Sequence, residues 1–131
     1  MAPVRVIIVD DFEPFRRSFR RFLESDTRVQ VVAEGENFGD AVKLISEVRP
    51  DLAILDLKMP APSNFRLNQI ADLSAKTNCC VLATSVWNDD EAEQIARAMG
   101  AVARFDKAAL PETLLPRMFE IIQSRRNSSA A

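Results

Sequence analysis

The sequence predicts an α/β fold in which five short strands alternate with five helices. Short apolar runs rich in β-branched residues recur along the 131-residue chain, and longer segments with helical spacing lie between them. Alternation of this kind gives a parallel sheet with helices on both faces, joined by right-handed crossovers. The runs are continuously apolar, which is typical of strands that are buried on both sides.

The first half of the chain contains two strand–helix pairs. Val4–Val9 is dominated by valine and isoleucine and predicts the first strand. Glu13–Glu24 predicts the first helix, because phenylalanines recur on one face and arginines lie largely on the other. These arginines are Arg16, Arg17, Arg20 and Arg21. We interpret this basic face as solvated. Val29–Ala33 and Phe38–Val48 predict the second strand and helix.

The second half completes the pattern with three further strands and three helices. We expect the strands at Leu52–Leu55, Cys79–Ala83 and Val102–Phe105, and the helices at Phe65–Ala75, Asp90–Met99 and Leu114–Gln123. Gly100 follows the fourth helix, as a helix-ending glycine does. Pro116 falls in the first turn of the last helix if Thr113 caps it, and there its missing N–H costs little. We expect one domain over residues 1–123 and a polar, flexible tail over residues 124–131.

Composition excludes several classes of function. The formal net charge is −2, and no apolar run approaches the ~20 residues of a membrane span. The start of the chain does not resemble a signal peptide. The chain has no histidine, which excludes Ser-His-Asp and Cys-His catalysis and imidazole metal sites. Cys79 and Cys80 are adjacent and point to opposite faces of a strand, so we interpret them as buried thiols of a cytoplasmic protein.

Polar side chains end four of the five predicted strands. They are Asp10 and Asp11, Asp56, Thr84 and Ser85, and Asp106 and Lys107. In an open α/β sheet the carboxyl ends of the strands form the ligand crevice. We therefore expect three carboxylates, a hydroxyl and an ammonium group to converge there. The second strand contributes only Glu34, which we expect to lie away from the site.

Three crowded acids need a counter-cation, and their chemistry indicates which one. Oxygen ligands without histidine or thiolate favour Mg²⁺ over Zn²⁺, and protein-bound Mg²⁺ usually completes its shell with waters and phosphate oxygens. Lys107 and Thr84 are suited to hold phosphoryl oxygens, one as a point charge and the other as a hydroxyl donor. Each residue alone has an ordinary structural role as a cap, strand or surface residue, and only the combination predicts a phosphoryl site.

This combination resembles the CheY-like receiver domain of two-component response regulators, from about Val4 to Gln123. The matching segments are VIIVDDFEPFRR, PDLAILDLKMP, VLATS and GAVARFDK. The segments VDDFEPFRR and LLPRM are most similar to receivers of the NarL/LuxR type, which usually precede a helix-turn-helix domain. The resemblance implies a flavodoxin-like (βα)5 doubly wound parallel sheet with strand order 2-1-3-4-5. A stand-alone receiver and a fragment of a DNA-binding regulator both remain open.

The resemblance also implies roles for individual residues. Asp56 corresponds to the phosphoacceptor, which receives its phosphoryl group from a histidine kinase or phosphotransfer protein. Thr84 and Lys107 correspond to the residues that hold the phosphoryl oxygens and move with them. Mg²⁺ is implied at Asp10, Asp11, Asp56 and the backbone carbonyl of Lys58. Contact with DNA would need an output domain outside this chain, and a homodimer is left open.

Three positions depart from the family pattern. Arg104 stands where receivers usually carry a switch tyrosine or phenylalanine, and alternation sends Phe105 into the core and Arg104 toward the fourth helix or solvent. Asn64 replaces the usual glycine of the loop after Asp56, and we expect it to supply a left-handed backbone. Val86 offers no acid or amide to orient an attacking water, which predicts slow autodephosphorylation.

Three other functions are alternatives to the phosphorylated receiver. A pseudo-receiver that docks proteins without phosphorylation is the main alternative, although all the site residues are intact. An FMN-binding flavodoxin is disfavoured because Asp10 and Asp11 would repel the phosphate. An aspartyl phosphohydrolase usually has its nucleophile on the first strand and an added cap domain, for which this chain is short.

Overall fold

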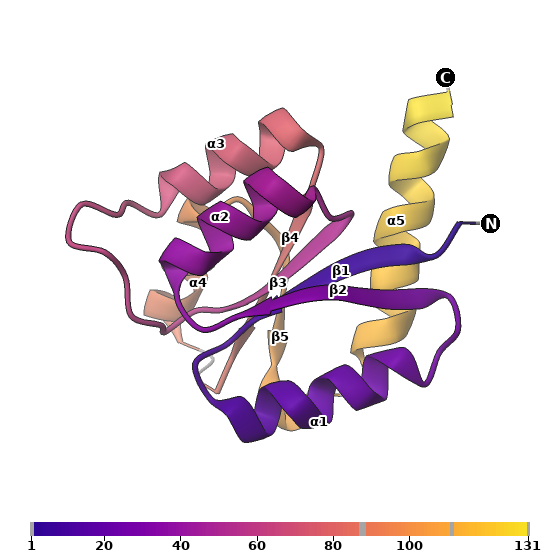
Figure 1. Ribbon diagram of the computed structural model, residues 1–131, viewed down its shortest axis with the longest axis horizontal. Coiled ribbons are helices and arrows are strands. Elements are labelled where there is room, and N and C mark those ends of the chain that lie inside the picture. Colours follow the sequence, from indigo (N-terminus) through magenta and orange to yellow (C-terminus); the bar gives the residue numbers. More distant parts are fainter. Residues whose placement is uncertain (1, 87–88, 111, 131) are drawn as a thin grey trace.

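The computed structural model describes residues 2–86, 89–110 and 112–130, with side chains as far as residue 127. Strands and helices alternate throughout, as predicted (Figure 1). The strands are β1 (Val4–Val9), β2 (Val29–Gly35), β3 (Leu52–Asp56), β4 (Cys80–Ser85) and β5 (Ala101–Asp106). The helices are α1 (Glu13–Glu24), α2 (Phe38–Val48), α3 (Asn68–Thr77), α4 (Asp90–Ala98) and α5 (Leu114–Ala130), with a short 3-10 helix, η1, at Lys107–Ala109.

The strands form one parallel sheet in the order β2-β1-β3-β4-β5, which confirms the predicted fold class. The register aligns the carboxyl ends of the inner strands. Val9 pairs with Leu55, and Asp56 pairs with Thr84. Thr84 in turn pairs with Phe105. The residues at and just after these positions therefore share one edge of the sheet.

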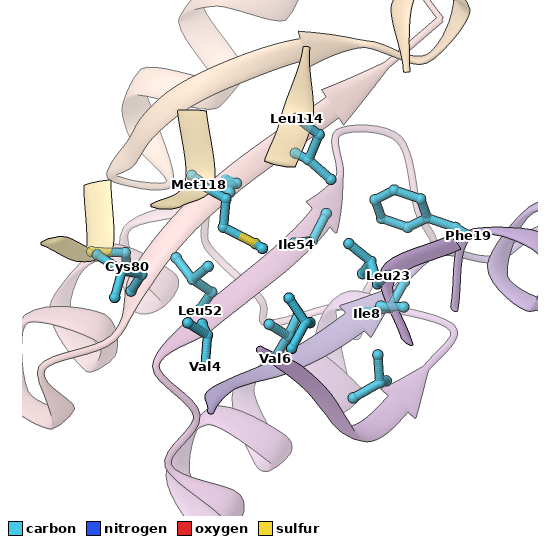
Figure 2. Packing of buried hydrophobic residues seen from close by; sticks show 14 of the residues in the cluster. Val4, Val6, Ile8, Phe19, Leu23, Leu52, Ile54, Cys80, Leu114 and Met118 are labelled. Carbon is cyan, nitrogen blue, oxygen red and sulfur yellow. The ribbon is translucent and has the colours of Figure 1, made fainter. Parts of the chain in front are cut away.

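Helices cover both faces of the sheet and make two separate apolar layers. On one face, α1 and α5 pack Phe19, Leu23, Leu114 and Met118 against the strands (Figure 2). On the other face, α2, α3 and α4 supply a second cluster around Ile45 and other buried side chains. Figure 1 shows α1 and α5 on one side of the sheet and α2 and α3 on the other. The central strand β3 is buried along its whole length, as its continuous apolar sequence requires.

Several local predictions are confirmed. Gly100 follows α4 and its C-cap residue with φ of 77°, a left-handed conformation that glycine adopts without strain. Because α5 begins at Leu114, Pro116 lies in its first turn. Cys79 and Cys80 are free and buried. They belong to opposite apolar layers, since Cys80 lies in the α1–α5 layer and Cys79 in the layer of α2, α3 and α4.

The segment before α3 differs from its prediction. The helix begins at Asn68 and not at Phe65, because Phe65 serves as a loop anchor whose ring stacks on Phe38 at 4.9 Å between centroids. The Phe65 N–H donates to the Pro62 carbonyl and closes a turn. Asn64 was expected to be left-handed, but among the described non-glycine residues only Arg49 and Asn78 have positive φ. The prediction for Asn64 was therefore wrong.

The last helix is longer than the sequence predicted. α5 was expected to end at Gln123, but it continues through residues 124–130. Two arginines attach this extension to the edge of the sheet opposite the strand carboxyl ends. Arg125 donates to Asn78 Oδ1 and to Cys80 Sγ, and Arg126 donates to the Ala2 carbonyl at 3.3 Å.

In the described parts of the chain, no helix combines the length and apolarity that crossing a membrane would require.

Candidate functional site

The sheet brings the predicted site residues to one place. Asp10 follows β1, Asp56 ends β3, Thr84 lies near the end of β4, and Lys107 follows β5. Hydrogen bonds continue the sheet into these residues: the Asp10 N–H donates to Gly35 at 3.0 Å. Near Lys107, the Asp106 side chain accepts from the Ala108 N–H and begins the 3-10 turn.

Three carboxylates form the centre of the site. One carboxylate oxygen from each of Asp10, Asp11 and Asp56 lies within 4.8 Å of the others. Asp10 is 1% exposed and Asp56 is 8% exposed, whereas Asp11 is open to solvent. Buried like charges this close repel one another unless a cation offsets them. We call these three residues the acidic pocket.

Lys107 provides a positive charge inside the acidic pocket. Its Nζ lies 2.7 Å from Asp10 Oδ2 and 3.7 Å from Asp56 Oδ1. The same ammonium group lies over the ring of Phe15, 4.4 Å from its centroid, which adds a cation–π contact. Lys107 was predicted from its position after the last strand. Phe15 is one of the phenylalanines on the apolar face of α1, and nothing in the sequence predicts its contact with Lys107.

Asp10 is fixed on several sides. Its Oδ1 accepts a hydrogen bond from the Phe12 N–H at 2.9 Å, and its backbone carbonyl accepts one from Arg16 at 2.7 Å. Its Oδ2 is buried and has the ion pair with Lys107 but no hydrogen bond of good geometry. This oxygen therefore retains coordination capacity that the described protein groups do not fill.

The pKa of the Asp56 carboxyl is set by burial and by the charges around it. Burial raises the pKa of its carboxyl from 3.8 to about 6; the Lys107 charge lowers the pKa and the Asp10 charge raises it. The contact from the backbone N–H of Lys58 to Asp56 Oδ1 is long, at 3.5 Å. Near neutral pH the carboxylate is thus ionised but incompletely solvated, which makes it available to an electrophile.

Thr84 and Lys58 complete the predicted set. Thr84 is 1% exposed, and its backbone carbonyl accepts from the Leu57 N–H at 3.0 Å, which ties β4 to the end of β3. Lys58 is exposed and lies two residues beyond Asp56. The structure therefore brings Asp10, Asp11, Asp56, Thr84 and Lys107 to one edge of the sheet, with Lys58 beside them.

The basic face of α1 is not uniformly solvated, which corrects the prediction from sequence. The Arg16 side chain is only 11% exposed, and its Nε lies 3.0 Å from Glu34 Oε1. Arg20 also contacts Glu34, at 2.5 Å. Arg17 is 68% exposed and pairs with Glu13 on its own helix, as a solvated residue would. A single acid at the end of the neighbouring strand was the available signal for the buried arginine.

The departure at Arg104 has the predicted geometry. Phe105 is 7% exposed and belongs to the α1–α5 layer. Arg104 faces α4, where its guanidinium lies 3.3 Å from Glu93 Oε2. The position that usually carries a switch aromatic thus holds an ion pair on the surface between β5 and α4.

The sequence of the site region matches a known family model. The model is the response regulator receiver domain, and it covers residues 6–119. The chain belongs to this family. It is therefore a receiver domain of the kind found in two-component response regulators, as the strand-end residues suggested.

Two longer proteins are similar to this chain in sequence. The chain is 32% identical over 78% of its length to protein-glutamate methylesterase/protein-glutamine glutaminase 3 of Geobacter sulfurreducens, covering 27% of that protein. It is 29% identical over 87% of its length to the transcriptional regulatory protein YdfI of Bacillus subtilis, covering 53% of that protein. The chain thus spans between a quarter and about half of these two relatives.

Solved receivers of the NarL/LuxR type have the same architecture. The signal receiver domain of NarL from Mycobacterium tuberculosis superposes with a TM-score of 0.81 at 26% identity, covering 94% of this chain and 98% of that one. A LuxR-family two-component response regulator from Aurantimonas sp. SI85-9A1 gives 0.80 at 25% identity, with 95% and 88% covered. These structural similarities agree with the sequence motifs VDDFEPFRR and LLPRM, which indicated this type.

The acidic pocket of this receiver has a donor set that suits a hard divalent cation. Its ligands are carboxylate oxygens, and the chain contains no histidine. The incompletely bonded Asp10 Oδ2 is a further indication, because a buried carboxylate oxygen normally has its full set of partners. The residues present therefore fit Mg²⁺.

Proposed function

We propose that this receiver accepts a phosphoryl group on Asp56 with the help of Mg²⁺ and changes conformation in response. The observation that carries the proposal is the convergence of three carboxylates within 4.8 Å, with the Lys107 ammonium between two of them. Phosphoryl transfer depends mostly on positioning and charge neutralisation, and this pocket offers both.

The donor we propose is the phosphohistidine of a histidine kinase or phosphotransfer protein. A carboxylate oxygen of Asp56 forms a bond to phosphorus, the phosphorus–nitrogen bond breaks, and the imidazole of the donor leaves with the electron pair. Asp10, Asp11, Asp56 and the Lys58 backbone carbonyl would hold Mg²⁺. Bound Mg²⁺ would neutralise phosphoryl oxygens and orient them. We propose that the receiver meets this donor in the cytoplasm.

Lys107 and Thr84 would hold the new phosphoryl oxygens. Phosphorylation gives Asp56 roughly two negative charges and adds oxygens that need donors. The Lys107 ammonium is already 3.7 Å from Asp56, so a small movement brings it to the phosphoryl group. The Thr84 hydroxyl lies on the adjacent strand, in register with Asp56. Their movement would shift the loops after β4 and β5 between two arrangements.

Amide exchange tests this conformational step separately. The loop after β4 is expected to exchange differently when a phosphoryl mimic is bound, over residues 84–90, of which Trp87 and Asn88 lie outside the described residues. Identical exchange in both states would contradict the switch while leaving the transfer chemistry standing.

Intact mass after incubation with acetyl phosphate and Mg²⁺ tests the proposed function directly. We expect a gain of one phosphoryl group that disappears in Asp56→Asn and when EDTA replaces Mg²⁺. Asp72→Asn is the matched control, because Asp72 is an exposed aspartate of α3, away from the pocket, and this variant should still gain the group. A wild-type chain that stays unmodified would refute the proposal and favour a docking module that works without phosphorylation.

The signal from this receiver would be passed on by the domain or protein that it contacts. Its relatives include longer proteins named as transcriptional regulators and as methylesterases. We propose that any contact with DNA is made by an output domain beyond this receiver, and that residues 1–123 form the regulatory unit. Self-association into a homodimer would be measured by sedimentation with and without the phosphoryl mimic.

A further inference from the structure

One arginine of α1 is built into the site and its neighbours are not. Arg16 is 11% exposed at the side chain, whereas Arg17, the next residue, is 68% exposed. Arg16 donates to two oxygens from different strand ends: the Asp10 backbone carbonyl at 2.7 Å and Glu34 Oε1 at 3.0 Å. The largely buried guanidinium thus uses two of its N–H groups for two fixed acceptors, an arrangement that a solvated arginine does not keep.

The bond to Asp10 acts on the peptide group between the two pocket acids. The Asp10 carbonyl belongs to the peptide that joins Asp10 to Asp11, so Arg16 fixes the plane of that peptide. The Asp10 N–H is held by Gly35, and Asp10 Oδ1 is held by the Phe12 N–H. Together these contacts fix Asp10 and the backbone that leads to Asp11. The placement of the exposed Asp11 carboxylate depends on that backbone.

Glu34 orients the arginine. It is the last residue but one of β2, which pairs with β1 in a register that places Glu34 beside Ile8. Glu34 contacts Nε of Arg16, while the NH1 group of the same guanidinium reaches the Asp10 carbonyl. Glu34 is shared with Arg20, and Arg16 also lies 3.7 Å from Glu36 Oε1. Since these two acids together largely offset the two arginine charges, the main effect of Arg16 on the pocket is geometric.

We infer that Arg16, oriented by Glu34, is a positioning residue that preorganises Asp10 and Asp11 for a divalent cation. The inference rests on the proposed Mg²⁺-dependent function and extends it to residues outside the pocket. Groups that orient the ligands of a metal site typically change metal affinity about 10- to 100-fold when they are removed. Arg16 touches no carboxylate of the acidic pocket directly in its described contacts, so it acts through the backbone.

Mg²⁺ titration by calorimetry, without any phosphodonor, tests the inference. Arg16→Ala is expected to weaken Mg²⁺ binding by about tenfold or more. Arg17→Ala is the matched control, because it removes the same charge from the same helix and its partner is Glu13; it should change binding less than about twofold. Arg16→Lys keeps the charge but lacks the planar guanidinium, so it should recover only part of the affinity.

Two further measurements separate positioning from general damage. Amide exchange at Asp11 and Phe12 should become faster in Arg16→Ala, while urea unfolding in EDTA shows whether the fold persists. If Arg16→Ala does not fold, Arg16→Lys and Glu34→Gln carry the test, and both are expected to weaken Mg²⁺ binding. In phosphorylation of Arg16→Ala by acetyl phosphate, two quantities are compared with the wild type as fold-changes. The Mg²⁺ concentration that gives half the maximal rate should rise by a larger factor than the rate at saturating Mg²⁺ falls.

The outcomes distinguish this inference from the proposed function. Unchanged Mg²⁺ affinity in folded Arg16→Ala, or an equal loss in Arg17→Ala, overturns the positioning role even if the chain is phosphorylated. A wild-type chain that binds Mg²⁺ but gains no phosphoryl group overturns the proposed function, while a selective loss of Mg²⁺ binding in Arg16→Ala still supports the positioning role. A wild-type chain that binds no Mg²⁺ overturns both.

Discussion

Neutralising Asp56 should stabilise the metal-free receiver at neutral pH. Burial raises the pKa of the Asp56 carboxyl to about 6 from an ordinary 3.8, against the lowering effect of Lys107. The folded state therefore holds this proton more tightly than the unfolded state. The stabilising effect of the proton is fully present below about pH 4 and is lost as the pH rises through about 6.

The pKa difference sets the size of the effect. Each pKa unit corresponds to about 1.4 kcal/mol, so ionised Asp56 lowers the free energy of unfolding by about 3 kcal/mol at pH 7. Asp56→Asn resembles the protonated acid in shape and removes this penalty. The variant should match the wild type near pH 4 and exceed it by up to about 3 kcal/mol at pH 7.

Urea unfolding in EDTA at a series of pH values measures this difference. Asp72→Asn, at an exposed position of α3, provides the control and should show little dependence of its stability difference on pH. Added Mg²⁺ should narrow the gap, because it stabilises the ionised wild type. The reasoning is refuted if Asp56→Asn is no more stable than the wild type at pH 7, or if its advantage is the same at pH 4.

Three further predictions concern the core, the surface and the phosphorylated form. Leu82→Ala should lower the free energy of unfolding by about 2 to 5 kcal/mol, because Leu82 is fully buried; a loss below about 1 kcal/mol in urea would contradict this. Arg104→Ala should cost less than about 1 kcal/mol, since its ion pair with half-exposed Glu93 lies at the surface; a larger loss in the same assay would contradict this. The phosphorylated form should persist well beyond seconds, because Val86 cannot orient an attacking water; intact mass over time measures its decay, and a half-life of seconds would exclude this explanation.

The convergence of the candidate site residues could be predicted from the sequence because these residues lie at strand ends. Asp10, Asp56 and Lys107 each follow or end an apolar run, and parallel strands finish at the same edge of a sheet. The order of the strands came from the family resemblance, since the alternation of strands and helices alone allows other orders. The register that pairs Asp56 with Thr84 is seen in the structure and could not be read from the sequence.

The role of Arg16 could not be read from the local pattern. Four arginines at helical spacing look alike, and a run of such charges is usually solvated. What distinguishes Arg16 is its burial and its bond to the Asp10 carbonyl. Glu34, which orients it, is distant in sequence and becomes its partner only when β2 pairs with β1. Tertiary contacts also explain the length of α5. Its last turns have a polar composition typical of a tail, but Arg125 and Arg126 attach them to the sheet.

The adjacent cysteines give this fold a pair of internal reporters. Cys79 and Cys80 are separated by one peptide bond, yet each is sealed in a different helical layer. A thiol reagent can reach either sulfur only when the layer above it opens, and burial, which raises the pKa of Cys79 to about 12, slows that thiol further. In variants that keep one cysteine at a time, the rate of thiol labelling would report local opening on each side of the sheet separately. Comparing the two rates would show whether phosphorylation of Asp56 increases opening on one side more than on the other.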